Sequence, residues 1–177
     1  MIALLRHAVA IAVLPFTVAV LVPLRIASRN AITLMLGPSA GAVTFQVLGV
    51  ALIALGLRLF VASLSRFATE GRGTLAPWDP PRELVVRGPY RFVRNPMISG
   101  VLFVLFGQAL LLLSRPHAVW AAIFLGANLI YIPFFEEPQL ERRFGDAYRE
   151  YRRHVRRFVP RLRPWVPTQE PPTSGVS

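Results

Sequence analysis

Hydrophobic residues gather in four long runs separated by polar stretches. The runs cover about residues 8–24, 43–63, 97–113 and 118–135. A membrane-spanning helix requires roughly 20 consecutive apolar residues, and each run approaches that length, although the last two are somewhat short. Those two could instead be buried helices of a soluble protein, but the presence of four such runs in one small chain favours membrane spans. The pattern therefore predicts an all-α, polytopic membrane bundle of about four transmembrane helices.

The connection between the third and fourth runs is the four-residue stretch SRPH, residues 114–117. A link this short joins two antiparallel helices as a hairpin. The start of the third helix and the end of the fourth are therefore expected to lie side by side at one membrane face.

Beyond the fourth run, apolar residues recur at spacings of three and four, which is typical of an amphipathic helix. They are Leu140, Phe144, Tyr148, Tyr151 and Val155. The opposite face carries Arg142, Arg143, Arg149, Arg152 and Arg153. The pattern predicts a cytoplasmic amphipathic helix that lies on the bilayer or covers a pocket beside it. A short extended piece is expected at 83–86 and a disordered tail at 164–177, which leaves 1–163 as a single domain.

Composition supports the membrane interpretation and narrows the chemistry. The 177 residues are 54% hydrophobic, with a mean hydropathy of +0.48, which exceeds that of ordinary soluble domains. The absence of cysteine excludes disulfides, thiolate metal sites and a cysteine nucleophile. The three histidines lack ligand-like spacing, so no metal site is expected. Interfacial anchoring is expected of the three tryptophans, Trp78, Trp120 and Trp165.

All 20 basic residues are arginines, and they give the chain a net charge of +11. A nucleic-acid partner is not expected, because the arginines flank apolar segments without a recognisable nucleic-acid-binding pattern. Residues 64–96 and the region after 135 hold most of them, so the positive-inside rule places both regions and both termini in the cytoplasm. Arginine without lysine suggests a GC-rich genome, and hence a bacterial inner membrane. Arg58, near the end of the second run, either snorkels or lines a pocket.

The predicted hairpin brings polar residues from two distant stretches together at the cytoplasmic boundary. They are Tyr90, Arg91, Arg94, Asn95, Glu136 and Glu137. In a structural interpretation, one of the two arginines pairs with one of the glutamates and fixes the hairpin. In a functional interpretation, the helix start attracts an anion and the glutamates suit an ammonium, a sulfonium or ribose hydroxyls. S-adenosylmethionine fits both halves of such a cleft.

Two blocks on either side of the hairpin carry a family resemblance. They read LVVRGPYRFVRNPMISG and FFEEPQLERRFGDAYREYRRHVRRFVPR. In these blocks, over about residues 82–163, the chain resembles the isoprenylcysteine carboxyl methyltransferase and phospholipid methyltransferase group of integral membrane enzymes. The first two runs show no signature. The resemblance implies S-adenosylmethionine-dependent methyl transfer at the cytoplasmic face, with the cofactor capped by the C-terminal segment.

The resemblance also implies roles for individual residues. Expected to line the cofactor pocket are Leu84, Val85, Tyr90, Asn95, Pro96, Met97, Ile98 and Glu136. Arg94 is assigned to the catalytic residues. The resemblance names no general base; with Glu136 assigned to the cofactor, Glu137 is the candidate, and a base is needed only where the acceptor is an ammonium that must first lose a proton. Gly88, Gly100, Phe144 and Gly145 fit the pattern as structural positions.

Three departures from the family pattern bear on the methyl acceptor. Asn95 stands at the family's histidine, Ile98 at its second aromatic residue, and Ile132 at an arginine that the prenylcysteine enzymes link to substrate. The acceptor therefore stays open among an isoprenoid-linked carboxylate, a lipid amine and a small hydrophobic acid or thiol. Two other functions also stay open: an NADPH-dependent membrane reductase of the steroid or sterol type, and a non-enzymatic membrane protein on the same scaffold.

Overall fold

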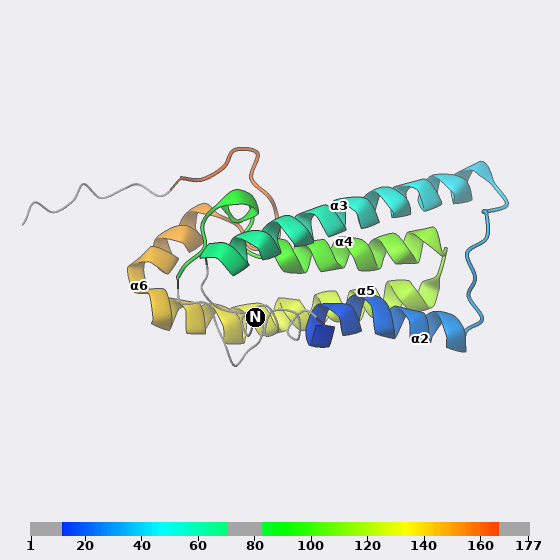
Figure 1. Ribbon diagram of the computed structural model, residues 1–177, viewed down its shortest axis with the longest axis horizontal. Helices are drawn as coiled ribbons and strands as arrows, with labels where there is room; N and C mark the ends of the chain where they lie inside the picture. Colours follow the sequence, from blue (N-terminus) through cyan, green and yellow to red (C-terminus); the bar gives the residue numbers. More distant parts are fainter. Residues whose placement is uncertain (1–11, 71–82, 167–177) are drawn as a thin grey trace, which may run out of the picture.

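The computed structural model describes residues 12–70 and 83–166, and Figure 1 shows them as a bundle of elongated helices with a small cap at one end. The helices, in chain order, are η1 (Ala12–Leu21), α2 (Val22–Arg29), α3 (Ala40–Glu70), η2 (Gly88–Arg91), α4 (Pro96–Leu111), α5 (Arg115–Tyr131), η3 (Ile132–Glu136) and α6 (Glu137–His154). No β-strand occurs in these two ranges, and residues 83–86 run as irregular chain. The predicted all-helical fold is confirmed.

Two helical stretches are long and apolar enough to cross a membrane. They are Ala40–Phe67, within α3, and the continuous stretch Arg115–His154, which joins α5, η3 and α6. The third run forms α4, which has only 16 residues. The first run corresponds to η1 and α2, and its residues 8–11 lie outside the described ranges. Length and composition therefore support a membrane protein but do not establish four spans.

Large apolar side chains cover the outside of α3 and α5. Val47, Val61 and Ile130 are each more than half exposed, at 62%, 61% and 61%. A water-soluble protein rarely presents continuous apolar surface of this kind. The surface of these two helices suits hydrocarbon, and the apolar part of the long stretch that begins with α5 ends at Phe135, before the glutamate pair.

The predicted antiparallel hairpin is formed by α4 and α5, which pack against each other. Figure 1 shows the two helices running side by side from the short connection that joins them. Ser114 caps α5: its Oγ accepts a hydrogen bond from the backbone N–H of His117 and lies 2.7 Å from Nδ1 of the same residue. Because α4 is covered by both α3 and α5, more than half of its residues are buried.

Helices α3 and α4 approach each other at paired glycines. A Cβ added to Gly56 would lie 2.6 Å from the carbonyl oxygen of Gly100, and one added to Gly49 would lie 2.7 Å from that of Gly107. Side-chain carbon at these positions would overlap with the backbone of the facing helix. The glycines therefore permit the backbone contact that holds α4 in register with α3.

Two carbonyl groups of η1 are bound by side chains from the hairpin. Gln108 donates from Nε2 to the Ala19 oxygen at 2.9 Å, and Trp120 donates from Nε1 to the Val18 oxygen at 3.1 Å. Pro23 has no N–H, so it cannot bond either oxygen from four or five residues further along the helix. Trp120 was predicted as an interfacial anchor, but its indole ties η1 to α5. Trp78 lies outside the described ranges.

The predicted amphipathic helix is present, and its apolar face packs inward. Tyr148, Tyr151 and Val155 form a buried cluster with Trp165, against which Leu84, Val86, Leu140 and Phe144 pack. The helix is kinked at Gly145, whose φ of 54° is in the left-handed region. Trp165 is 9% exposed, so its assignments to a disordered tail and to interfacial anchoring were both wrong. Residues 167–177 lie outside the described ranges.

Candidate functional site

A tight turn before α4 forms one side of the candidate site. Gly88 has φ 55°, and the Arg66 side chain lies directly beside it, 3.2 Å from where a Cβ would stand. This turn rests on the end of α3, and the following η2 contains Tyr90. The chain then enters α4 through Asn95 at its N-cap and Pro96 in its first turn.

The glutamate pair is presented by a π-helical turn, η3, at the far end of α5. The backbone N–H of Glu137 donates to the Ile132 oxygen five residues back. A π-helical turn rotates the side chains that follow it around the helix axis, and such turns are frequent at functional sites. Glu137 is 5% exposed and Glu136 is half-buried, while Ile132 is 1% exposed.

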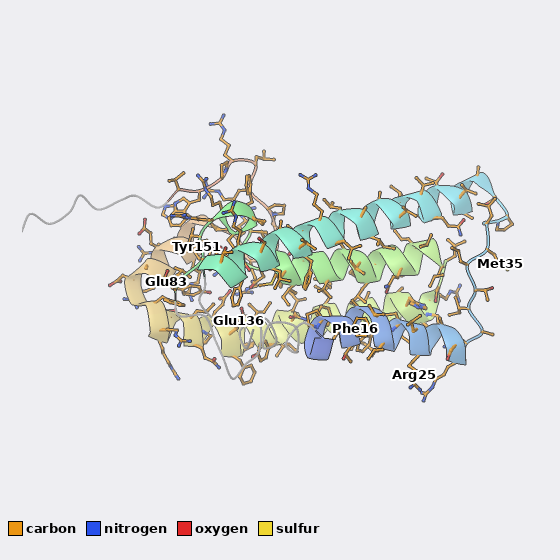
Figure 2. All side chains as sticks on the ribbon, viewed as in Figure 1. Phe16, Arg25, Met35, Glu83, Glu136 and Tyr151 are labelled. Carbon is orange, nitrogen blue, oxygen red and sulfur yellow. The ribbon has the colours of Figure 1, made fainter. Side chains whose placement is uncertain are left out.

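Glu137 is held by two arginines from different segments. Arg157 donates from Nε to Oε1 at 2.7 Å and from Nη2 to Oε2 at 3.0 Å, and Arg94 Nη2 lies 3.2 Å from Oε1. The structural pairing is thus present, between Arg94 and Glu137. Arg91 instead donates from Nε to the Trp165 oxygen at 2.8 Å. Figure 2 shows the end of the molecule where these segments meet.

Arg157 was missed by the sequence analysis. It stands in the stretch YRRHVRRFVPR, where arginines are so dense that no spacing distinguishes one from the next. Its backbone carbonyl accepts from the Asn95 N–H at 3.3 Å, and the preceding Arg156 carbonyl accepts from the Arg94 N–H at 2.9 Å. Arg157 therefore contacts both Glu137, through its side chain, and the loop before α4, through its backbone.

Two buried polar atoms of the site lack a hydrogen-bond partner within the described part of the chain. They are Oη of Tyr90, a residue 7% exposed, and Nε of Arg94. Burial, followed by the nearby Tyr151 and Glu136, raises the pKa of Tyr90 well above its ordinary value, so its hydroxyl stays a donor. The Tyr151 hydroxyl binds the Tyr90 carbonyl oxygen at 2.7 Å and fixes this residue. Buried polar atoms without partners are uncommon and call for an explanation.

Glu136 follows the last apolar residue of the fourth run and so lies outside the membrane-spanning segment. Burial and the adjacent Glu137 carboxylate raise the pKa of Glu136 to about 7, although Arg157 and Arg94 oppose this shift. Both protonation states are therefore accessible near neutral pH. A positively charged ligand group at this carboxylate would favour the ionised form.

The other predicted site residues surround this centre. Val85 is buried, and Leu84 packs on the tyrosine and tryptophan cluster of α6. The Asn95 carbonyl accepts from the N–H and the hydroxyl of Ser99 at 3.0 and 2.9 Å. Pro96 is fully buried, and the next two residues, Met97 and Ile98, are half-buried in the first turn of α4. The ionic centre thus joins Arg94 to Glu137, with Tyr90 and Glu136 beside it.

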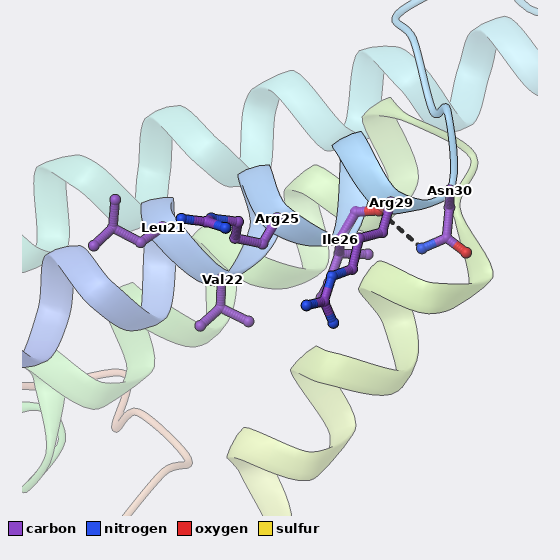
Figure 3. Close-up of a pocket in the computed structure, with 6 residues that line it drawn as sticks. All are labelled: Leu21, Val22, Arg25, Ile26, Arg29 and Asn30. Carbon is purple, nitrogen blue, oxygen red and sulfur yellow. Dashed lines mark hydrogen bonds between the residues drawn. The ribbon is translucent and has the colours of Figure 1, made fainter.

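A separate hollow of about 390 Å³ lies on α2 (Figure 3). Its lining residues are Leu21, Val22, Arg25, Ile26, Arg29 and Asn30. Asn30 donates from Nδ2 to the Ile26 oxygen at 2.8 Å, which closes the end of the helix. None of the predicted site residues borders this hollow.

Comparison with protein families shows the family to which the chain belongs. The phospholipid methyltransferase family matches residues 44–147, more than half of the chain. The chain belongs to this family. The expected resemblance is confirmed, and the match begins inside α3, where the sequence analysis had found no signature. No curated protein and no solved structure gave a significant match.

The phospholipid methyltransferase family consists of membrane methyltransferases, which supports enzymatic methyl transfer and a membrane location for this chain. The match ends within α6, before Arg157. The contacts of that arginine therefore rest on the structure of this chain alone.

Proposed function

We propose that this phospholipid methyltransferase family member transfers a methyl group from S-adenosylmethionine to an amphiphilic or lipid-like acceptor. The reaction takes place at the membrane face that holds Glu136. The observation that carries the proposal is the pair of buried, unpartnered donors, Tyr90 Oη and Arg94 Nε, beside a glutamate whose pKa is about 7.

These groups suit the cofactor chemically. A buried donor without a partner costs about 1–3 kcal/mol, and a ligand carboxylate can accept from both Tyr90 and Arg94. Glu136 can bind an ammonium or a ribose hydroxyl. When bound, S-adenosylmethionine supplies a methyl group made electrophilic by its sulfonium. Tyr90, Arg94 and Glu136 therefore fit the two charged ends of this cofactor.

The remaining residues position the reactants and exclude water. The buried cluster of Tyr148, Tyr151 and Trp165 covers the loop that carries Tyr90. Methyl transfer needs in-line alignment more than acid or base catalysis, and a dry, fixed site supplies that alignment. The acceptor enters from the bilayer, beside the exposed Phe134 and Phe135. An isoprenoid-linked carboxylate, a lipid amine and a small hydrophobic acid or thiol all satisfy this route.

The predicted division of work between the glutamates changes in this proposal. Both oxygens of Glu137 are bound to guanidinium groups, so accepting a proton there would disrupt two ion pairs. We assign Glu137 and Arg157 to positioning Arg94, rather than Glu137 to general base catalysis. An ammonium acceptor would lose its proton to Glu136, whereas a carboxylate or thiolate acceptor needs no base.

Ligand titration of the purified full chain in lipid nanodiscs tests the cofactor. We expect saturable binding of S-adenosylmethionine and of its demethylated product, at least about tenfold weaker in Glu136→Gln. Asp146→Asn is the matched control, because the Asp146 side chain is 94% exposed on α6. Binding of NADPH with no response to S-adenosylmethionine would support a reductase and overturn the proposal.

A transfer assay with methyl-labelled cofactor and a membrane lipid extract then tests the reaction. Label in an extractable amphiphile supports the proposed acceptor class and identifies it. Cofactor binding without transfer to any fraction would favour a non-enzymatic scaffold.

A further inference from the structure

The C-terminal segment, residues 155–166, has one face fixed to the candidate site. Its backbone bonds the loop before α4 through Arg161 N–H to the Phe92 oxygen at 2.9 Å and Trp165 N–H to the Arg91 oxygen at 3.0 Å. Arg157 adds the ion pair with Glu137. Although it lacks regular secondary structure, the segment is therefore held along the loop at several points.

The other face of this segment is apolar and cationic. Val159, Leu162 and Val166 are 55%, 100% and 63% exposed. The same segment carries the exposed arginines Arg156 and Arg163, and residues 155–166 include no acidic residue. The guanidinium groups of Arg156 and Arg163 make no ion pair within the described part of the chain. A fully exposed leucine in a segment with two arginines that form no ion pair is unfavourable in water but suits the boundary of an anionic bilayer.

The position of the segment matches that boundary. The loop that carries it rests on Arg66, near the end of α3. In Figure 1 the segment projects sideways from the bundle beside this end of α3, away from the long axis. The apolar stretch Ala40–Phe67 ends at the same place, and Leu57 and Val61 are exposed along it. The segment therefore lies at the level where α3 leaves the hydrocarbon.

We propose that the outer face of residues 155–166 binds the anionic phospholipid surface of the adjacent leaflet. Val159, Leu162 and Val166 enter the boundary between headgroups and acyl chains, while Arg156 and Arg163 bind lipid phosphates. The occupant is an anionic phospholipid because exposed aliphatic side chains and exposed arginines occur together on the segment, and the segment has no acidic residue to repel phosphate. The proposal does not depend on methyl transfer.

Site-directed fluorescence tests this contact directly. The chain has no cysteine, so Leu162→Cys gives a unique thiol for an environment-sensitive label. Leu162 is fully exposed, so its replacement removes no packing contact and is expected to leave the fold intact. The labelled full chain is placed in vesicles of phosphatidylcholine with or without phosphatidylglycerol, together with a nitroxide-bearing lipid as quencher. Ala147→Cys, exposed on α6, is the matched control.

We expect the label at position 162 to be quenched at least about twofold more than the label at 147, and more strongly when phosphatidylglycerol is present. Replacing both arginines, Arg156→Gln with Arg163→Gln, should remove the dependence on phosphatidylglycerol. Equal, weak quenching at both positions would show that the outer face stays in water and would overturn the proposal. The proposal would also be overturned if the label at position 162 left water only when a second protein was added and not in vesicles alone.

Discussion

Arg157 and Glu137 form a two-point ion pair in which Nε and Nη2 of the guanidinium donate to separate carboxylate oxygens, at 2.7 and 3.0 Å. The pair joins the C-terminal segment to the start of α6, next to the loop before α4. Arg94, from that loop, shares the same carboxylate. One buried glutamate thus connects three segments that are distant in sequence.

Replacing Glu137 tests the importance of this connection. Glu137→Ala leaves Arg94, whose side chain is 9% exposed, without its counter-charge. Loss of one partner from a buried ion pair costs about 3–5 kcal/mol, so the melting temperature of the purified protein should fall strongly. Arg149→Gln is the control, because its partners Asp146 and Glu141 are 94% and 31% exposed, and such surface pairs contribute little. Equal melting temperatures for the two variants would show that the ion pairs of Glu137 do not stabilise the fold.

Helix periodicity and the short hairpin predicted from sequence that the polar residues of two distant stretches meet. Arg94 and Glu137 stand 43 positions apart (137 − 94), yet an antiparallel hairpin of similar helices places them at the same end. The amphipathic pattern from Leu140 to Val155 likewise identified the residues that pack together, because a period of 3.6 defines one face whatever it covers.

Features that depend on tertiary contacts could not be predicted in this way. Trp165 lies at the start of a proline-rich stretch typical of disorder, and it is ordered by ring contacts with Tyr151 and His154 and by the hydrogen bonds to Arg91. The π-helical turn at Ile132 has no signal in the hydrophobic pattern. Arg157 resembles its neighbours in sequence, and only its contact with Glu137 sets it apart.

Tyr90→Phe should have opposite effects on the free and the ligand-bound protein. The hydroxyl is buried without a partner, so its removal relieves a desolvation cost. The free protein should therefore be as stable as before or more stable by about 1 kcal/mol, with a melting temperature that is unchanged or raised. The same change removes a donor from the proposed cofactor site. S-adenosylmethionine affinity should therefore fall about tenfold. A lower melting temperature with unchanged affinity would mean that Tyr90 has a structural role alone.

The pKa of Glu136 predicts how stability and binding depend on pH. Its value of about 7 lies above the ordinary 4.5, so the folded protein holds this proton more tightly than the unfolded chain. The contribution of Glu136 to stability is complete below about pH 4.5 and is lost as the pH rises through about 7.

Binding should show the reverse trend, because a cationic ligand group requires the Glu136 carboxylate. Affinity for S-adenosylmethionine should rise about tenfold per pH unit below the pKa and level off above it. Titrations and melting curves between about pH 6 and about pH 8 measure both trends. In Glu136→Gln both should disappear. A pH dependence that survives this substitution would assign the titration to another group.

The glycine contact between α3 and α4 predicts a steric effect far from the ionic centre. In Gly56→Ala the new Cβ would lie 2.6 Å from the Gly100 oxygen and 2.9 Å from the Val104 nitrogen, both backbone atoms that cannot rotate away. Overpacking of this kind costs about 1–3 kcal/mol. Gly126→Ala is the matched control, since a Cβ there has nothing within 4 Å and alanine is the better helix former. Melting temperatures should therefore fall for Gly56→Ala and hold or rise for Gly126→Ala. If Gly56→Ala matches its control, the two helices are further apart than this contact requires, and α4 would have to be packed differently against α3.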